Sequence, residues 1–190
     1  RFVAPTSAPE RTLPSLPSLL TNTLAKGEAW PATNRELNFR LTARDGKGGV
    51  SSDDMKIQVV NTGKAFALTS PLVTPLVAGQ TQTIDWDVAG TNAAPINCSK
   101  VDLYMTRDEG VNWTLLAGGQ PNSGSASVAI PAGSDGTARL KVACSDNLFF
   151  AISPLKLSVT QRVEGGGGGG GALGFWTLAL ALLGWQRRRA

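Results

Sequence analysis

Short stretches in which apolar and polar residues alternate recur along residues 66–161, and this period of two limits the fold more than any other feature. Ile84, Trp86 and Val88 fall on one side of an extended chain, because successive side chains of a strand point to opposite faces. The pattern recurs at Phe66 and Leu68; at Val101, Leu103 and Met105; at Val128 and Ile130; at Leu140 and Val142; and at Ile152, Leu155, Leu157 and Val159. Turn residues separate the stretches at intervals of roughly 8–12 residues, without a helical period. We therefore predict an all-β domain at 66–161, an Ig/fibronectin-like antiparallel β-sandwich of roughly six or seven strands.

A second β region is expected nearer the start of the sequence. Alternation occurs in residues 37–42 and again in 55–59, on either side of the glycine-rich segment 45–49. This pattern predicts a hairpin, the last of another β-sandwich. Five of the eleven prolines lie in residues 1–36, and proline cannot donate to a strand ladder, so this segment is expected to be extended or edge chain. We assign 1–61 to the C-terminal part of a cadherin/Ig-like β domain.

The last residues change character abruptly. Seven consecutive glycines at 165–171 predict a flexible linker, and residues 172–185 are apolar apart from two glycines and one threonine. Fourteen helical residues span about 21 Å, less than the roughly 30 Å of a bilayer core. No charge interrupts the stretch, and Arg187, Arg188 and Arg189 follow it, as is typical of a cytoplasmic flank. Residues 172–190 are therefore predicted to be a short transmembrane helix with an arginine cluster, and a buried core helix is the alternative.

The chain contains no histidine. It therefore has no Ser-His-Asp or Cys-His nucleophile system and no HExxH-type zinc site, which excludes most hydrolase mechanisms. The net charge of +4 comes from 18 Lys and Arg against 14 Asp and Glu. Three of the positive charges are the final arginines, so the rest of the chain is nearly neutral and offers no basic face for nucleic acid. We expect no catalytic residue, no resident cofactor and no nucleic-acid partner.

The glycine run, the short apolar span and the terminal arginines together resemble the GlyGly-CTERM sorting signal of Gram-negative bacteria. The resemblance implies an exported precursor that is anchored transiently in the inner membrane. It also implies a rhomboid-family intramembrane protease that removes the tail, and delivery to the cell surface or the medium by type II secretion. Glycines at the membrane boundary suit such a protease, because a helix that unwinds easily exposes its backbone. We place the cleavage region at Gly171 and Ala172.

Most of the remaining sequence is similar to the C-terminal accessory region of bacterial reprolysin-like zinc metallopeptidases. The matching stretches, in order, are 37–45, 52–55, 66–71, 88–91, 97–98 and 145–153. The resemblance implies a secreted zinc peptidase whose catalytic domain and zinc lie upstream, and the chain starts with Arg1 rather than Met, as a C-terminal piece would. No catalytic residue of that family can be carried over, because its HExxH helix has no counterpart here.

In an exported β-sandwich, Cys98 and Cys144 are expected to form a disulfide, because they flank two predicted strands and the compartment is oxidising. Two buried free thiols are the alternative.

Residues 106–113, with Thr106, Asp108, Gly110 and Trp113 in the pattern T-x-D-x-G-x-x-W, resemble an Asp-box hairpin. The aspartate would accept turn amides, the glycine would supply a positive φ, and the tryptophan would pack over the hairpin. A single copy cannot build a propeller, so we predict a structural turn rather than a sugar site.

Asp45, Asp53 and Asp54 flank the glycine-rich turn, in a pattern that resembles bacterial cadherin-like repeats. Such domains bind calcium through clustered carboxylates, but Ca²⁺ takes about six to eight oxygens. A solvated turn is therefore favoured over a calcium site. Asp85, Asp87 and Asp146 are likewise expected to be strand-face or turn residues.

Three functions remain in order of preference. The first is a non-catalytic accessory and sorting region of a secreted or surface-displayed zinc metallopeptidase. The second is a surface adhesin or carbohydrate-binding β-sandwich protein that carries the same tail. An enzyme that works through carboxylates alone is the third, and no pair of carboxylates stands out by spacing.

Overall fold

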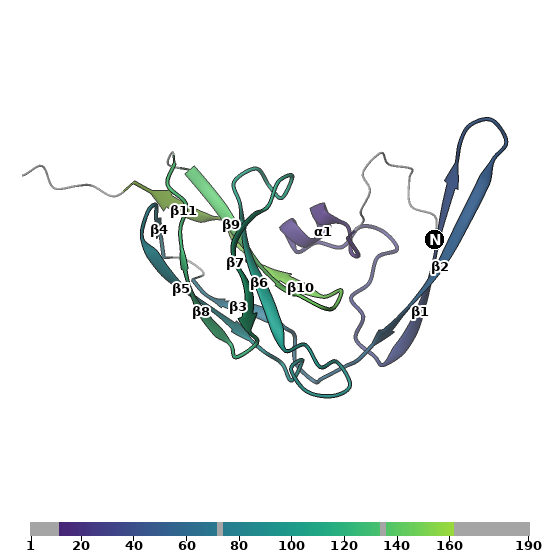
Figure 1. Ribbon diagram of the computed structural model, residues 1–190, viewed down its shortest axis with the longest axis horizontal. Helices are drawn as coiled ribbons and strands as arrows, with labels where there is room; N and C mark the ends of the chain where they lie inside the picture. Colours follow the sequence, from purple (N-terminus) through teal and green to yellow (C-terminus); the bar gives the residue numbers. More distant parts are fainter. Residues whose placement is uncertain (1–11, 72–73, 134–135, 162–190) are drawn as a thin grey trace, which may run out of the picture.

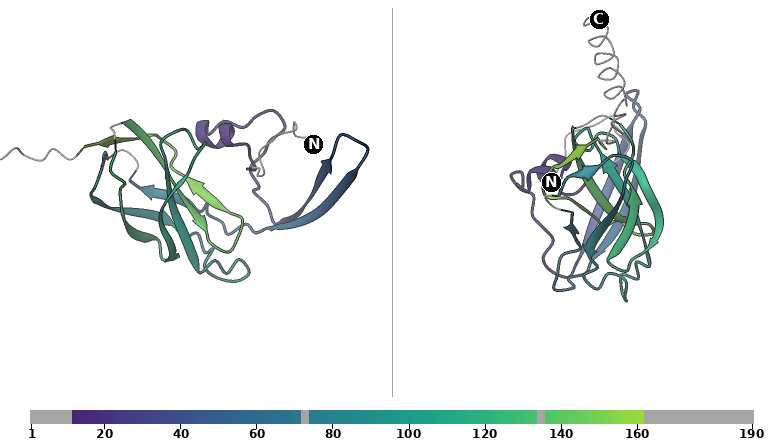
Figure 2. Two further views of the ribbon diagram at one scale, coloured as in Figure 1. Left: turned by 45° about the horizontal axis from the view of Figure 1, so that its top comes forward. Right: turned by 90° about the vertical axis from the view of Figure 1, so that its left-hand side faces the viewer.

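The structure, a computed structural model, describes residues 12–71, 74–133 and 136–161 (Figures 1 and 2). These residues form a β-sandwich, a separate two-stranded hairpin and a short helix. The elements in chain order are α1 (Leu16–Thr21), β1 (Arg35–Arg44), β2 (Val50–Val59), β3 (Ala67–Ser70), β4 (Leu76–Val77), β5 (Thr81–Asp87), β6 (Lys100–Thr106), β7 (Thr114–Pro121), β8 (Ser125–Ala129), β9 (Gly136–Cys144), β10 (Phe150–Ile152) and β11 (Leu157–Thr160).

Two sheets make up the sandwich. One has the strand order β3-β5-β8, and the other has the order β4-β11-β9-β6-β7, with β10 paired to a further part of β9. Among the strands that the structure describes, β4 and β11 form a parallel pair, in which Val159 lies opposite Leu76, and the other pairs are antiparallel. The all-β sandwich predicted for 66–161 is confirmed, but not as a purely antiparallel one. Strand β4 has only two residues, too few to show alternation.

The core lies between the two sheets. Ile84 and Trp86 point inward from β5, as their spacing predicts, and Val88 packs against the edge of the same cluster. The buried apolar residues are Leu68, Leu76, Ala78, Ile84, Trp86, Cys98, Val101, Leu103, Met105, Val128, Ile130, Ala138, Leu140, Val142, Cys144, Leu157 and Val159. Burying each large side chain of this kind contributes roughly 1.5–3 kcal/mol, so this cluster is the main source of the sandwich's stability.

Two parts of the sandwich differ from the predicted strands. Strand β7 was not predicted, because most of its residues are exposed and Gly118 and Gly119 interrupt any alternation. It lies at the edge of its sheet, paired to β6, and its burial pattern shows no regular inward face. The last predicted stretch is two strands, since Ile152 ends β10 while Leu157 begins β11. Leu155 lies between them and is 56% exposed.

The predicted hairpin is present as β1 and β2, which pair over ten residues each. Leu37 lies opposite Ile57, and Phe39 lies opposite Met55, so one face of the hairpin is apolar. The other face carries charged residues. The hairpin extends away from the sandwich (Figures 1 and 2), and its place in a second sandwich domain stays a prediction.

Helix α1 is a departure from the extended chain expected in residues 1–36. Pro17 occupies the first turn, where a missing N–H costs nothing because that group has no partner within the helix. Asn22 ends the helix in the left-handed conformation, with φ of 51°, which asparagine tolerates better than most residues. The six residues of α1 are too few to show a helical period. The prolines alone therefore led to the expectation of extended chain, which is wrong for Leu16–Thr21.

Within the described part of the chain, no helix is long and apolar enough to cross a membrane. The linker predicted at 165–171 and the apolar segment predicted at 172–190 lie outside the described residues.

Candidate functional site

The predicted disulfide joins Cys98 to Cys144, with 6.1 Å between the two Cα atoms. Cys144 ends β9 opposite Val101 of β6, and Cys98 lies in the loop that precedes β6. The disulfide therefore links this loop covalently to the end of β9, the neighbouring strand in the same sheet. Both cysteines are buried, so the disulfide is part of the core.

A buried asparagine holds the same loop from the other side. Asn122 accepts a hydrogen bond from Nε1 of Trp86 at 2.9 Å. Its amide nitrogen donates to Oγ1 of Thr91 at 3.1 Å and to the carbonyl oxygen of Cys98 at 3.0 Å. A buried polar group is costly when it has no partner. Asn122 provides such partners to both Trp86 and the loop that carries Cys98, and so links the two.

The three carboxylates considered for calcium have separate tasks in the hairpin. Asp45 closes the turn, where its Oδ1 accepts from the amides of Lys47 at 2.7 Å and Gly49 at 2.9 Å. These hydrogen bonds, that of Lys47 first, lower the pKa of the Asp45 carboxyl. Asp54 lies on β2 and makes a two-pronged ion pair with Arg40 of β1, with both N–O distances at 2.6 Å.

Asp53 precedes Asp54 on β2, opposite Leu41, and its Oδ1 accepts from the amide of Asp54 at 3.0 Å. The structure does not bring the three carboxylates together as a group of ligands. Asp45 thus accepts from the amides of its own turn, and both carboxylate oxygens of Asp54 pair with Arg40.

The other aspartates also serve local structure. Oδ1 of Asp85 accepts from the hydroxyl of Ser125 at 2.5 Å, and Oδ1 of Asp87 accepts from the amide of Ala89 at 2.8 Å. Asp146 places Oδ1 3.0 Å from Sγ of Cys144. Among the described residues, Cys98, Cys144 and Asp146 form the cluster of metal-ligand types. Its two sulfurs are joined to each other, so they are not thiolates available to a metal.

The Asp-box segment forms the structural turn that was predicted. Oδ1 of Asp108 accepts from the hydroxyl of Thr106 at 2.7 Å and from the amide of Asn112 at 2.9 Å. These bonds, the amide of Asn112 first, lower the pKa of Asp108 to about 2. Gly110 has a φ of 83°, and a Cβ atom there would lie 3.3 Å from the ring of Trp113. The turn therefore needs its glycine for conformation and for space.

The outer face of the larger sheet carries an aromatic cluster around Lys141. Its Nζ lies 4.3 Å from the ring centre of Trp113, 4.6 Å from Tyr104 and 6.0 Å from Phe150. Cation–π contacts of this kind contribute about 0.5–1 kcal/mol each at exposed sites. All three rings are partly exposed, and the lysine stem covers part of the aromatic surface.

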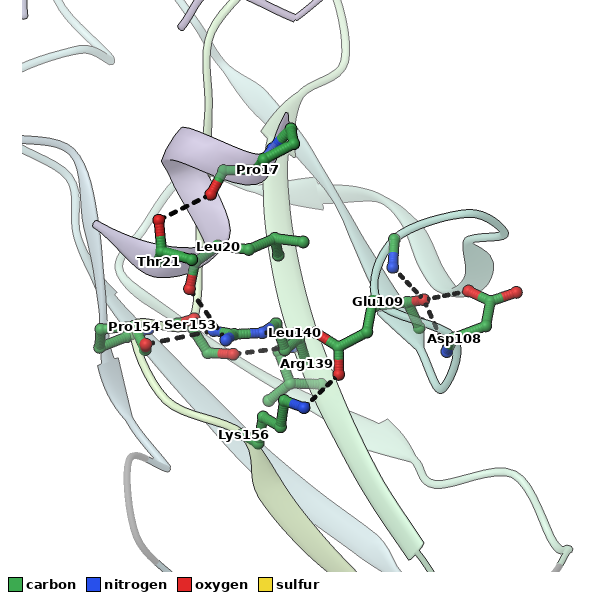
Figure 3. A network of polar contacts seen from close by, with 12 residues as sticks. Pro17, Leu20, Thr21, Asp108, Glu109, Arg139, Leu140, Ser153, Pro154 and Lys156 are labelled. Carbon is green, nitrogen blue, oxygen red and sulfur yellow. Dashed lines mark hydrogen bonds and ion pairs between the residues drawn. The ribbon is translucent and has the colours of Figure 1, made fainter. Parts of the chain in front are cut away.

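Figure 3 shows a polar network that the sequence did not predict, centred on Arg139 of β9. Arg139 is only 7% exposed. Its Nη1 donates to the carbonyls of Ser153 at 2.8 Å and Pro154 at 3.1 Å. Its Nη2 donates to the carbonyl of Leu20 in α1 at 2.9 Å.

An acidic residue completes the Arg139 network. Glu109 places Oε2 3.8 Å from Nε of Arg139, and its Oε1 pairs with Nζ of Lys156 at 2.5 Å. Arginine on a strand predicts no partner 119 residues earlier in the chain, so no sequence pattern could have found this contact.

The predicted cleavage region at Gly171 and Ala172 and the arginines at 187–189 lie outside the described residues. The sorting hypothesis therefore depends on the sequence alone.

No protein-family model matches the chain, and no curated protein is significantly similar to it. Among solved structures, the chain is similar to SGBP-B of the Bacteroides ovatus mixed-linkage glucan utilization locus, solved in complex with a mixed-linkage heptasaccharide. The identity is 17%, the TM-score is 0.30, and the match covers 73% of this chain. The chain spans only 31% of the length of that structure. At this identity and TM-score the likeness carries no inference about ligand or activity.

Proposed function

We propose that this chain is the non-catalytic accessory and sorting region of an exported bacterial zinc metallopeptidase. It consists of an Ig/fibronectin-like sandwich and the C-terminal part of a second β domain, followed by a tail that a rhomboid-type intramembrane protease removes. In this proposal the tail holds the precursor transiently in the inner membrane, and type II secretion then delivers the protein to the cell surface or the medium. The zinc belongs to the catalytic domain of the parent protein.

The Cys98–Cys144 disulfide carries this proposal. Disulfides persist in oxidising compartments and are rare in the cytosol, so a buried disulfide supports export. The other support comes from the sequence, in which a glycine run, an apolar span and three arginines follow the sandwich. The polar side chains described above stabilise turns, form ion pairs or support the core. Such roles fit a module that attaches and positions the parent protein.

Processing of the tail tests the proposal. The full precursor would be produced in a Gram-negative host with type II secretion, with and without its rhomboid-type protease, and the exported protein would be weighed by mass spectrometry. We expect a mature protein that lacks residues 172–190 when the protease is present, and an uncut, membrane-bound form when it is absent. A matched variant with glutamine at 187–189 should be inserted less well and cut less. An exported protein with an intact C-terminus would refute the sorting function.

A carbohydrate-binding module is the second candidate, and the aromatic cluster around Lys141 favours it. Aromatic rings on the outer face of a sandwich can stack on sugar rings, and Trp113, Tyr104 and Phe150 lie together there. The test is an NMR titration of the full chain with neutral glucose, mannose and galactose oligosaccharides at millimolar concentration. A saturable shift of the Trp113 indole N–H that is lost in Tyr104→Ala would support binding. Unchanged spectra with every oligosaccharide would reject it.

A further inference from the structure

Residues 15–28 form a small unit of their own around α1. Oε1 of Glu28 accepts from the amide of Ser15 at 2.9 Å, and Oε2 accepts from the hydroxyl of Ser18 at 2.6 Å and from the amide of Ala25 at 3.2 Å. One carboxylate thus joins the first turn of α1 to the chain that follows it. The hydrogen bond from Ser18, followed by that from Ser15, lowers the pKa of Glu28 to about 2. The Glu28 carboxylate is therefore ionised at neutral pH and can accept these hydrogen bonds.

The unit docks on the sandwich at two points. The guanidinium of Arg139 donates to the carbonyl of Leu20, one of the last helix carbonyls, which have no partner within the helix. A cation at this end also complements the helix dipole. At the other point Leu16 lies against Gly110, where an added Cβ would be 3.2 Å from Cδ2 of Leu16. Polar and apolar contacts thus come from opposite ends of α1.

The docking matters energetically because Arg139 is buried. Its two Nη atoms are satisfied only by carbonyls, and its Nε has no hydrogen-bond partner in the described structure. Undocking of α1 would break the hydrogen bond from the charged Nη2 to the Leu20 carbonyl, and hydrogen bonds to charged groups contribute more than neutral ones. The sandwich therefore favours the docked position of α1.

The hairpin is attached to the sandwich through this unit as well as directly. Residues 60–66 join β2 to β3, and residues 29–34 join the 15–28 unit to β1. The two connections are tied to each other: the amide of Asn61 donates to Oδ1 of Asn34 at 2.6 Å, and its side-chain nitrogen donates to the carbonyl of Ala32 at 3.0 Å. A connection through a single linker would allow relative motion, whereas two tied connections restrict it.

We propose that residues 15–28 are a brace that docks on β9 through Arg139 and holds the hairpin β1–β2 and the sandwich as one rigid unit. In Figure 1, α1 lies between the sandwich and the hairpin, as a brace would. An isolated two-stranded hairpin is at best marginally stable in water, so a second attachment also helps to maintain it. The brace does not depend on the sorting tail, and it would set a fixed spacing between the sandwich and whatever the hairpin contacts.

The test compares two variants of the full chain, Arg139→Gln and Glu28→Ala, by ¹⁵N relaxation and amide hydrogen exchange. In the unmodified chain, amides of β1–β2 and of the sandwich should report the same rotational correlation time. In each variant the hairpin should report a shorter time than the sandwich. Exchange at residues 15–28 should become at least about tenfold faster, as expected when a hydrogen bond to a charged group is lost.

Glu28→Ala guards against a general folding defect, because the hydrogen bonds described for Glu28 all lie within residues 15–28 and it is not part of the core cluster. Arg40→Gln is the matched control for Arg139, since it removes an exposed arginine whose partner lies within the hairpin; it should leave both readouts unchanged. Equal correlation times for hairpin and sandwich in both test variants would overturn the brace. So would unchanged exchange at residues 15–28.

Discussion

Reduction of the disulfide is the perturbation whose size can best be worked from the structure. The bonded cysteines are 46 residues apart, and in the chain-entropy model closing a loop of that length stabilises the folded state by roughly 4 kcal/mol. Both thiols would stay buried in the same core after reduction, so few native contacts change. The loss should therefore arise mainly in the unfolded state.

Urea unfolding followed by tryptophan fluorescence measures this loss, because Trp86 is buried in the core. The same chain would be compared before and after reduction with a phosphine. With a slope of about 1–3 kcal/mol/M, a loss of roughly 4 kcal/mol lowers the midpoint by about 1.3–4 M urea. The slope itself should rise on reduction, because an unfolded chain without the cross-link exposes more surface.

The double variant Cys98→Ala/Cys144→Ala is the control, and phosphine should not affect it. Its stability should lie near that of the reduced chain. The reasoning is refuted if oxidised and reduced proteins differ by less than about 1 kcal/mol, a quarter of the loop term. Labelling of both thiols in the native, unreduced protein would refute the bond itself.

Two further predictions concern buried and turn residues. Asn122→Ala should lower the free energy of unfolding by about 1–3 kcal/mol, because the indole N–H of Trp86 and the carbonyl of Cys98 lose their buried partner; a loss under about 0.5 kcal/mol in urea unfolding would contradict this. The carboxyl of Asp108 should titrate near pH 2 by ¹³C NMR. Its pKa is lowered on folding, so its contribution to stability is present above the unfolded value of 3.8 and is lost as the pH falls toward about 2. A midpoint at or above 3.8 would contradict the turn geometry.

The strands that could be predicted are those with one buried face. In β5 and β6 the inward residues, such as Ile84 and Leu103, alternate with outward ones because each strand separates core from solvent. The hairpin was predicted from the alternation of apolar and polar residues in β1 and β2 and from its Asp45 turn, although neither strand has a buried residue. Strand β7 was missed because it has no regular inward face.

Among the local sites, some could also be predicted from the sequence and others could not. The Asp-box turn was predictable because Thr106, Asp108 and Asn112 bond within a few residues of one another, so their geometry follows from spacing alone. The pairing of Cys98 with Cys144 was predictable because the choice was between only two cysteines. The contact of Arg139 with Leu20 was not, since its acceptor is a backbone carbonyl, which every residue carries.

The disulfide has a mechanical consequence. If tension were applied between residues 12 and 161, force would pass from β9 to the loop before β6 through the sulfur atoms, and the chain between Cys98 and Cys144 would bear no load. An extended chain spans about 3.4 Å per residue. The disulfide closes a loop of 46 residues, so roughly 150 Å of chain cannot be extended while the bond is intact. Breaking the sandwich by force would thus lengthen the oxidised molecule far less than the reduced one. The disulfide would thus limit how far the chain extends under tension.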